Sequence, residues 1–263
     1  MLTIQPVPAF TDNYIWLLHD PDSLEAYIVD PGDAAPVEDR LQQLGLTLSG
    51  ILITHHHFDH VGGLKALKEA HQCTVYGPDN PAITGIDNVV RAGDTITVLG
   101  REFDILEVPG HTLDHIAYFS QSSESSDTDH PLLFCGDTLF AGGCGRVFEG
   151  TFPMMLASLE SLAQLPGNTE IYCAHEYTLA NLAFAQAVEP DNQALATRVT
   201  QARQTRQQNQ PTVPSTIALE QATNPFLRAH CEQMREALRR QGRLEQETAE
   251  GVFATVRGWK DNF

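Results

Sequence analysis

Four histidines and one aspartate lie within residues 54–60, a stretch that reads THHHFDH. It directly follows the apolar run 50–53. Imidazoles and a carboxylate buried without partners at the end of a strand would cost several kcal/mol, and a bound metal ion would remove that cost. The stretch therefore indicates a metal site. Isolated histidines are more often surface or core residues, and we interpret the following four that way: His19, His71, His130 and His230.

Potential ligands also follow the ends of other apolar runs. Four runs each end two or three residues before such a side chain, and these side chains are His55, His111, Asp137 and His175. In open α/β sheets, sites form just outside the carboxyl ends of strands. If the runs are neighbouring strands, four separate segments deliver ligands to one cleft.

The candidate ligands divide into two sets of three and one bridging carboxylate, Asp137. His55 and His57 are two residues apart and point the same way in an extended turn. Three nitrogens form the open kind of site found in catalytic zinc centres. The two sets are, in order, His55, His57 and His111, and Asp59, His60 and His175.

Two metal ions about 3.5–4 Å apart, joined by a carboxylate and a water, form a hydrolytic centre. Metal binding lowers the pKa of water from about 15.7 to about 7, so a metal-bridging hydroxide is expected near neutral pH. Asp59 and Asp137 are the expected catalytic carboxylates, because Asp59 can also hold the hydroxide for attack. Mixed imidazole and carboxylate ligands suit zinc, iron and manganese, and we expect two divalent ions, with zinc first.

The elements that must position these residues change in character near residue 177. Before it, apolar or alternating runs bounded by Gly, Pro, Asp or Ser predict strands, and three periodic segments predict helices. The strands are 14–18, 26–30, 50–54, 96–100, 102–108, 116–120, 132–136 and 170–174, and the helices are 37–44, 64–71 and 154–162. After it, segments 179–189, 195–210 and 226–241 are predicted to be helical. The acidic segment 121–131 is predicted to be an exposed hairpin loop.

Composition excludes several classes of protein. The chain has 263 residues, 42% of them hydrophobic, which is enough for one sizeable domain plus a smaller one. A net charge of -18 disfavours nucleic acid or an anionic membrane as a partner. No apolar run approaches the roughly 18 residues of a membrane helix, and the N-terminus is not typical of a signal peptide. The five cysteines show no CxxC spacing. We expect a cytoplasmic monomer.

Six motifs together resemble a known family. They are FTDNYIWLL, IVDPGD, THHHFDHVGG, VPGHTLDHI, FCGDTLFAGGCGRVFEGT and CAHEYTLANLAFA. From about residue 4 to the C-terminus the chain is similar to the hydroxyacylglutathione hydrolases (glyoxalase II) of the metallo-β-lactamase superfamily. The resemblance implies an α/β fold, a four-layer αββα sandwich over residues 1–176, followed by a small all-helical substrate-binding domain over 177–263.

The resemblance also implies the reaction. This is hydrolysis of the thioester S-D-lactoylglutathione to glutathione and D-lactate, the second step of methylglyoxal detoxification. The hydroxide would attack the thioester carbonyl, and the metals would stabilise the oxyanion. A thiol of pKa about 8.5 can leave as the thiolate, so no general acid is required.

Glutathione contacts carry over by position. The corresponding residues are Arg146, Phe148, Tyr177, Arg257 and Lys260. Arg257 and Lys260 are three residues apart, hence on one face of a helix. Phe148 stands where some relatives have Tyr, and Asp114 stands where relatives often have Gly. We interpret Asp30 as bracing the backbone near the site, and His115 as either orienting a neighbour or packing.

The same residues disfavour several other functions. One alternative keeps the fold and acts on a different thioester, a lactone or a β-lactam, but zinc β-lactamases commonly place Cys at the position of Asp137. A nuclease would be basic along its RNA path, whereas this chain is acidic, which disfavours a nuclease. Oxygen- or nitric-oxide-reducing di-iron relatives prefer Glu at the position of His57. The seven-ligand set disfavours a binding module without activity. Cys144 has no evident base beside it, so we do not assign it as a nucleophile.

Overall fold

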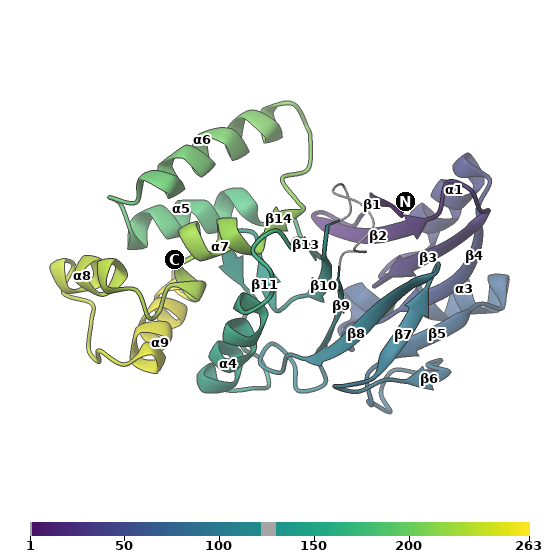
Figure 1. Ribbon diagram of the computed structural model, residues 1–263, viewed down its shortest axis with the longest axis horizontal. Helices are drawn as coiled ribbons and strands as arrows, with labels where there is room; N and C mark the ends of the chain where they lie inside the picture. Colours follow the sequence, from purple (N-terminus) through teal and green to yellow (C-terminus); the bar gives the residue numbers. More distant parts are fainter. Residues whose placement is uncertain (1, 122–129) are drawn as a thin grey trace. The chain divides into compact units, whose positions relative to one another are not determined.

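The computed structural model describes residues 2–121 and 130–263 (Figure 1). The chain divides into two compact units. The first unit comprises residues 1–108 and 114–136, and the second comprises 109–113 and 137–263. Most of the predicted acidic loop, 122–129, lies outside the described residues. The second unit contains 137–176 together with the helical region, and the domain boundary predicted at 176/177 stays a prediction.

One sheet of the first unit has six strands in the order in which they occur along the chain. The first three pair antiparallel and the rest pair parallel. The strands are β1 (Thr3–Ala9), β2 (Asn13–His19), β3 (Glu25–Val29), β4 (Thr47–Leu52), β5 (Thr74–Gly77) and β6 (Asn88–Val89). Because β4 is parallel to both neighbours, its carboxyl end lies at one edge of the sheet with theirs, which is where a site is expected.

Helices pack on this sheet through an apolar stripe. The three helices are α1 (Ala34–Leu44), α2 (Phe58–Val61) and α3 (Leu64–His71). Val37 and Leu41 of α1 and Leu67 of α3 share a buried cluster with strand residues such as Ile51. Val37 and Leu41 are four residues apart, and Leu64 and Leu67 are three apart, so α1 and α3 each have one apolar face. The predicted helices 37–44 and 64–71 are confirmed.

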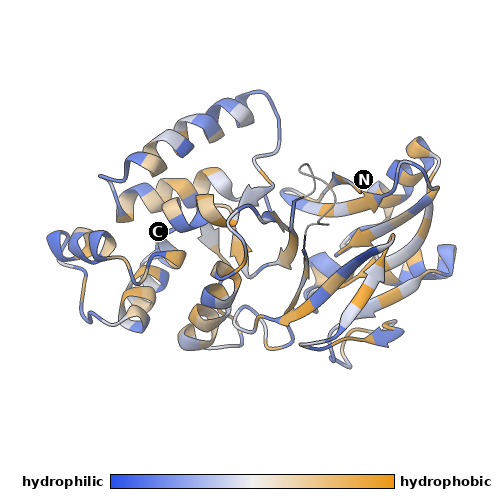
Figure 2. Ribbon diagram, in the orientation of Figure 1, coloured by the Kyte–Doolittle hydropathy of each residue, from blue (hydrophilic) through white to orange (hydrophobic). Residues whose placement is uncertain are grey.

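The remaining strands of this unit pair antiparallel in the order β10, β9, β8, β7. They are β7 (Thr95–Val98), β8 (Arg101–Glu107), β9 (Ile116–Ser120) and β10 (Leu132–Gly136). Figure 2 shows hydrophobic residues interspersed with more hydrophilic ones along β7 and β8, which agrees with the alternation of buried and exposed residues in these strands. Tyr118 of β9 is fully buried, and its hydroxyl donates to the carbonyl of Ile53 at 2.8 Å. This bond ties the second set of strands to the segment that enters the histidine-rich turn.

The second unit begins with a short hairpin and continues mainly as helices. The hairpin strands are β11 (Leu139–Phe140) and β12 (Gly143–Cys144), and β13 (Glu170–Cys173) pairs antiparallel with β14 (Ser215–Thr216). The helices are α4 (Phe152–Ala163), α5 (Thr178–Val188), α6 (Gln193–Gln207), α7 (Ile217–Thr223), η1 (Pro225–Leu227, 3-10), α8 (Glu232–Arg240) and α9 (Ala249–Lys260). Within the described residues, no helix has the length and apolar character needed to cross a bilayer.

The predicted helix 226–241 is wrong at its start. Pro225 begins a 3-10 turn, and the Asn224 side chain accepts the Phe226 N–H at 3.0 Å. The backbone then becomes extended at Cys231 before α8 begins. In the intervening turn Arg228 donates to Glu189 at 2.7 and 3.0 Å. This part-buried ion pair lies in the turn between the 3-10 helix and α8, where the helical periodicity of the sequence does not continue.

Candidate metal centre

The histidine-rich turn follows β4 and leads directly into α2. His57 is the N-cap residue of α2 and keeps an extended backbone. His55 and His60 are buried, at 0% and 1% exposure, whereas the side chain of Asp59 is 39% exposed. The His55 and His57 rings lie 4.9 Å apart between centroids, and those of His55 and His60 lie 4.1 Å apart. The first unit thus brings its four predicted ligands together.

Asp30, just after β3, organises this turn. Its carboxylate accepts the Thr54 N–H at 2.8 Å, the Thr54 hydroxyl at 2.7 Å and Nδ1–H of His60 at 3.0 Å. Because the Thr54 hydroxyl donates to Asp30, its oxygen accepts Nδ1–H of His55 at 3.0 Å. In both histidines Nε2 therefore carries the lone pair, as a metal ligand requires. The predicted bracing role of Asp30 is confirmed.

His115 packs directly on this arrangement. Its ring stacks on His55 at 4.5 Å and 14°, and its Nδ1 donates to the carbonyl of Ile116 at 3.0 Å. Gly136, at the end of β10, has a φ of +46°. A Cβ there would lie 2.4 Å from the Thr54 hydroxyl oxygen and 2.9 Å from the His115 ring. The site therefore requires glycine at residue 136.

The second unit brings the other three predicted ligands together, with His111 and His175 both beside Asp137. Its Oδ2 lies 3.4 Å from Nε2 of His111, and its Oδ1 lies 3.3 Å from Nε2 of His175. All three residues are buried, at 4–7% exposure. Nδ1 of His111 donates to the carbonyl of Arg146 at 2.7 Å, so its Nε2 carries the lone pair. Each oxygen of one carboxylate thus faces a different histidine.

These donor sets fit metal ions. Metal–ligand bonds of about 2.0–2.2 Å place neighbouring ligand atoms of a tetrahedral site about 3.3–3.6 Å apart. The two distances at Asp137 and the 3.6 Å between Asp59 Oδ2 and His60 Nε2 all fall in that range. The histidine and aspartate clusters are therefore suited to a dinuclear metal site.

Three of the predicted glutathione contacts lie beside the second unit's ligands. The Tyr177 ring stacks on His175 at 4.7 Å and 4°. The Phe148 ring is 60% exposed and meets His111 edge-on at 5.3 Å. The Arg146 guanidinium lies 5.8 Å from the centroid of the Phe148 ring. An exposed aromatic ring therefore lies against His111, and a cation lies beside that ring.

Arg257 and Lys260 both belong to α9, as predicted for residues on one helix. Arg257 is only 4% exposed, and it donates to the carbonyl of Cys144 at 3.2 Å and to Asp261 at 2.9 Å. Lys260 is half-buried, and its ammonium lies 5.3 Å from the centroid of the Phe184 ring. Burial, and then the charge of Arg257, lower the pKa of Lys260 below its usual value. Their contacts with substrate stay predictions.

Two sequence interpretations concern residues near the ligands. Cys144 is buried, and burial raises the pKa of its thiol to about 11, so it is a neutral thiol at physiological pH. This agrees with not assigning it as a nucleophile. Asp114 accepts Nδ1–H of His56 at 2.9 Å and an amide N–H of Asn80 at 2.8 Å. Aspartate thus orients the middle histidine of the cluster, which glycine could not do.

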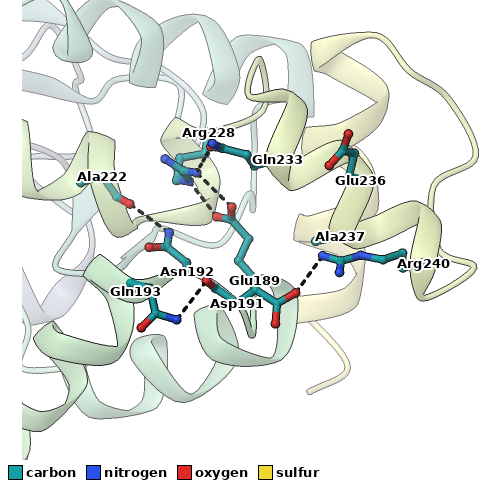
Figure 3. Close-up of a pocket in the computed structure, with 10 residues that line it drawn as sticks. All are labelled: Glu189, Asp191, Asn192, Gln193, Ala222, Arg228, Gln233, Glu236, Ala237 and Arg240. Carbon is teal, nitrogen blue, oxygen red and sulfur yellow. Dashed lines mark hydrogen bonds and ion pairs between the residues drawn. The ribbon is translucent and has the colours of Figure 1, made fainter.

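A separate cavity of about 400 Å³ opens in the helical region (Figure 3). Its walls carry two ion pairs, Arg228 with Glu189 and Arg240 with Asp191. None of the predicted metal ligands or glutathione contacts lines it. Because these charges compensate one another, the cavity is not assigned as the substrate site.

Comparisons with known proteins agree with this geometry. Residues 10–175 match the model of the metallo-β-lactamase superfamily, and residues 176–263 match that of the hydroxyacylglutathione hydrolase C-terminus. The chain is 54% identical to a hydroxyacylglutathione hydrolase of Pseudomonas fluorescens and 52% identical to one of Chromohalobacter salexigens, over the full length of each. The crystal structure of ETHE1 from Myxococcus xanthus is 25% identical, with a TM-score of 0.64 over 99% of this chain and 98% of that one.

The predicted α/β class and metallo-β-lactamase fold with a helical C-terminal region are confirmed. Full-length matches above 50% identity carry the assignment beyond the superfamily. The chain belongs to the hydroxyacylglutathione hydrolase family, a family of thioester hydrolases.

Proposed function

We propose that the chain hydrolyses S-D-lactoylglutathione to glutathione and D-lactate with two divalent metal ions. Family membership supports the substrate. The arrangement at Asp137, with one oxygen facing His111 and the other facing His175, is the observation that best supports a shared centre. The proposed ligands are His55, His57, Asp59, His60, His111, Asp137 and His175.

The ions, when bound, would supply a nucleophile from water near neutral pH and polarise the thioester carbonyl. The chain's own residues hold that chemistry in place. Asp137 would offer one carboxylate oxygen beside His111 and the other beside His175. Asp59 accepts an amide N–H of Asn13 on Oδ2 at 3.0 Å, which fixes the orientation of its carboxylate. We propose zinc as the native metal, with iron or manganese as the alternatives that the same ligands accept.

Two cationic side chains, Arg146 and Lys260, are proposed to bind the carboxylates of glutathione. In a chain with a net charge of -18, an anionic substrate needs local positive charge. Arg146 can bind a carboxylate through two parallel N–H bonds, and Lys260 offers a point charge. Tyr177 and Phe148 would flank the peptide, and Arg257 is retained as a contact. We further propose a cytoplasmic monomer without nucleic acid or membrane partners.

Metal-dependent thiol release tests the proposed function. Metal-free protein should be inactive, and protein reconstituted with two equivalents of zinc should release thiol from S-D-lactoylglutathione. The reconstituted protein should prefer this thioester to nitrocefin and to a lactone, because its cations are proposed to read glutathione. Faster turnover of the lactone or nitrocefin would reject the substrate. Equal activity of metal-free and reconstituted protein would reject the metal chemistry.

Replacing Lys260 by alanine should raise KM for the thioester about tenfold and leave kcat little changed, because the lost contact binds substrate and not the reacting atoms. The matched control is Arg239→Ala, which removes an exposed cation of α8. The measurement is the KM and kcat of both variants for the thioester, by steady-state kinetics. An unchanged KM in Lys260→Ala would remove the residue from the substrate site.

The lowered pKa of Lys260 also predicts a pH dependence. The ammonium is present below its folded-state pKa and is lost as pH rises through that pKa, which lies below the usual value. KM should therefore rise with pH in the alkaline range. In Lys260→Arg the guanidinium stays charged, so the part of the rise that belongs to residue 260 should disappear. Identical alkaline profiles of KM in the two proteins would contradict this assignment.

A further inference from the structure

The hairpin β11–β12 connects directly to two of the proposed ligands. Asp137 lies two residues before β11, and the N–H of Gly145, just after β12, donates to the carbonyl of Thr138 at 3.2 Å. The carbonyl of Arg146, the residue after Gly145, accepts Nδ1–H of His111 at 2.7 Å. The position of this hairpin therefore determines where the carboxylate of Asp137 and the ring of His111 lie.

The hairpin packs closely against the backbone of Asp137 and the ring of His111. A Cβ on Gly145 would lie 1.9 Å from the carbonyl oxygen of Asp137 and 3.1 Å from Nδ1 of His111. The turn of the hairpin is made by Gly142 at a φ of +72°, which glycine adopts at no steric cost. A displacement of the hairpin would therefore be passed to both ligands.

Side chains from the helical region bind the backbone of this hairpin. The Asn224 amide donates to the carbonyls of Phe140 at 3.2 Å and Gly143 at 2.8 Å, two residues that face each other in the hairpin. Glu220 accepts the N–H of Gly142 at 2.8 Å. Two further donors bind neighbouring carbonyls, Asn181 on that of Ala141 at 3.3 Å and Arg257 on that of Cys144 at 3.2 Å.

Glu220 and Asn224 are themselves held from behind. Both are 0% exposed, and Nδ2 of Asn224 lies 3.0 Å from Oε2 of Glu220. The other oxygen of Glu220 accepts bonds from Arg198 and from the Ser215 hydroxyl. Arg198 also donates to the Thr223 hydroxyl at 2.6 Å. A buried, charge-compensated network thus fixes the two side chains that hold the hairpin.

We propose that Asn224 and Glu220 are positioning residues for the metal centre, holding the β11–β12 hairpin so that Asp137 and His111 keep ligand geometry. The inference rests on the proposed function for its link to catalysis. Residues that hydrogen-bond around metal ligands typically tune metal affinity or activity by about tenfold to a hundredfold.

The test is Asn224→Ala, with Asn192→Ala as its matched control. Asn192 also lies in the helical region and also donates its amide to a carbonyl, that of Ala222 at 3.0 Å (Figure 3), a residue outside the hairpin. Asn224→Ala should lower zinc affinity, measured by competition with a chelator, about tenfold to a hundredfold. Its kcat should fall with little change in KM. Asn192→Ala should lose thermal stability without either effect.

Zinc affinity and kcat equal in the two variants would overturn the proposal, because a purely structural role lowers stability alone. If Asn224→Ala does not fold, Asn224→Ser applies the same criterion, since serine can still accept the Phe226 N–H but cannot reach both carbonyls. The chelator measurement needs no substrate. Wild-type protein that binds zinc but leaves the thioester intact therefore rejects the proposed function alone, and wild-type protein that binds no zinc rejects both.

Discussion

Asp137→Ala should lower the rate of thioester hydrolysis by at least about a thousandfold, because the metal chemistry it supports lowers the pKa of water by many units. The two oxygens of Asp137 lie 3.4 and 3.3 Å from the ring nitrogens of His111 and His175. One substitution therefore removes the carboxylate that faces both histidines. His57→Ala should have a similar effect by removing one imidazole of the first set. Thiol release and bound zinc per chain are measured together.

The control for this loss is Asp104→Ala. Asp104 is an exposed carboxylate of β8 that accepts the Thr95 hydroxyl at 2.8 Å and lies outside the proposed ligand set. It should keep wild-type rate and metal content. If Asp137→Ala still binds two zinc ions and turns over at a rate close to wild type, the bridging role is rejected together with the mechanism built on it.

Arg198→Ala should lower the free energy of unfolding by about 3–5 kcal/mol, because it leaves the carboxylate of Glu220 buried without its cation. The side chains of this pair are 6% and 0% exposed, so water cannot replace the lost partner. The same change loosens the network behind Asn224. Urea denaturation followed by circular dichroism measures the loss, with the m-value checked for a change in the denatured state.

Arg240→Ala is the matched comparison within the helical region. Arg240 pairs with Asp191 at 2.9 Å, but the two side chains are 64% and 73% exposed. Exposed pairs contribute at most about 1 kcal/mol, so its loss should be small. Similar losses in the two variants would show that the Arg198–Glu220 pair does not stabilise the fold as its burial implies.

The sequence was sufficient to predict candidate ligands because four of them, His55, His111, Asp137 and His175, follow strand-like runs. Ile53 and Cys173 end apolar segments, and His55 and His175 come two residues later. A strand end is a local signal, and imidazoles there need a partner that the chain alone seldom provides. The helices of the first unit were equally local, since Val37 and Leu41 repeat at helical spacing.

The network behind the hairpin could not be predicted in this way. Glu220 and Asn224 stand in a polar, glutamine-rich region that is typical of an exposed helix surface. Their partners Gly142 and Gly143 lie about eighty residues earlier, and only tertiary packing brings them together. The short helix α7 was missed for the same reason. No periodicity in the sequence reports a carboxylate that is buried to accept a backbone N–H.

The bonds to the hairpin limit how modular this protein is. The region 176–263 matches a family model of its own, which invites its treatment as an exchangeable accessory. Yet Asn181, Glu220, Asn224 and Arg257 all reach from that region to the backbone of residues 140–144. A chimaera whose region 176–263 comes from a distant relative should be active only if that region has the same four side chains at these positions. Under the two proposals made above, the tail would contribute both substrate contacts and the geometry of the metal centre, so changes in either property would constrain the other.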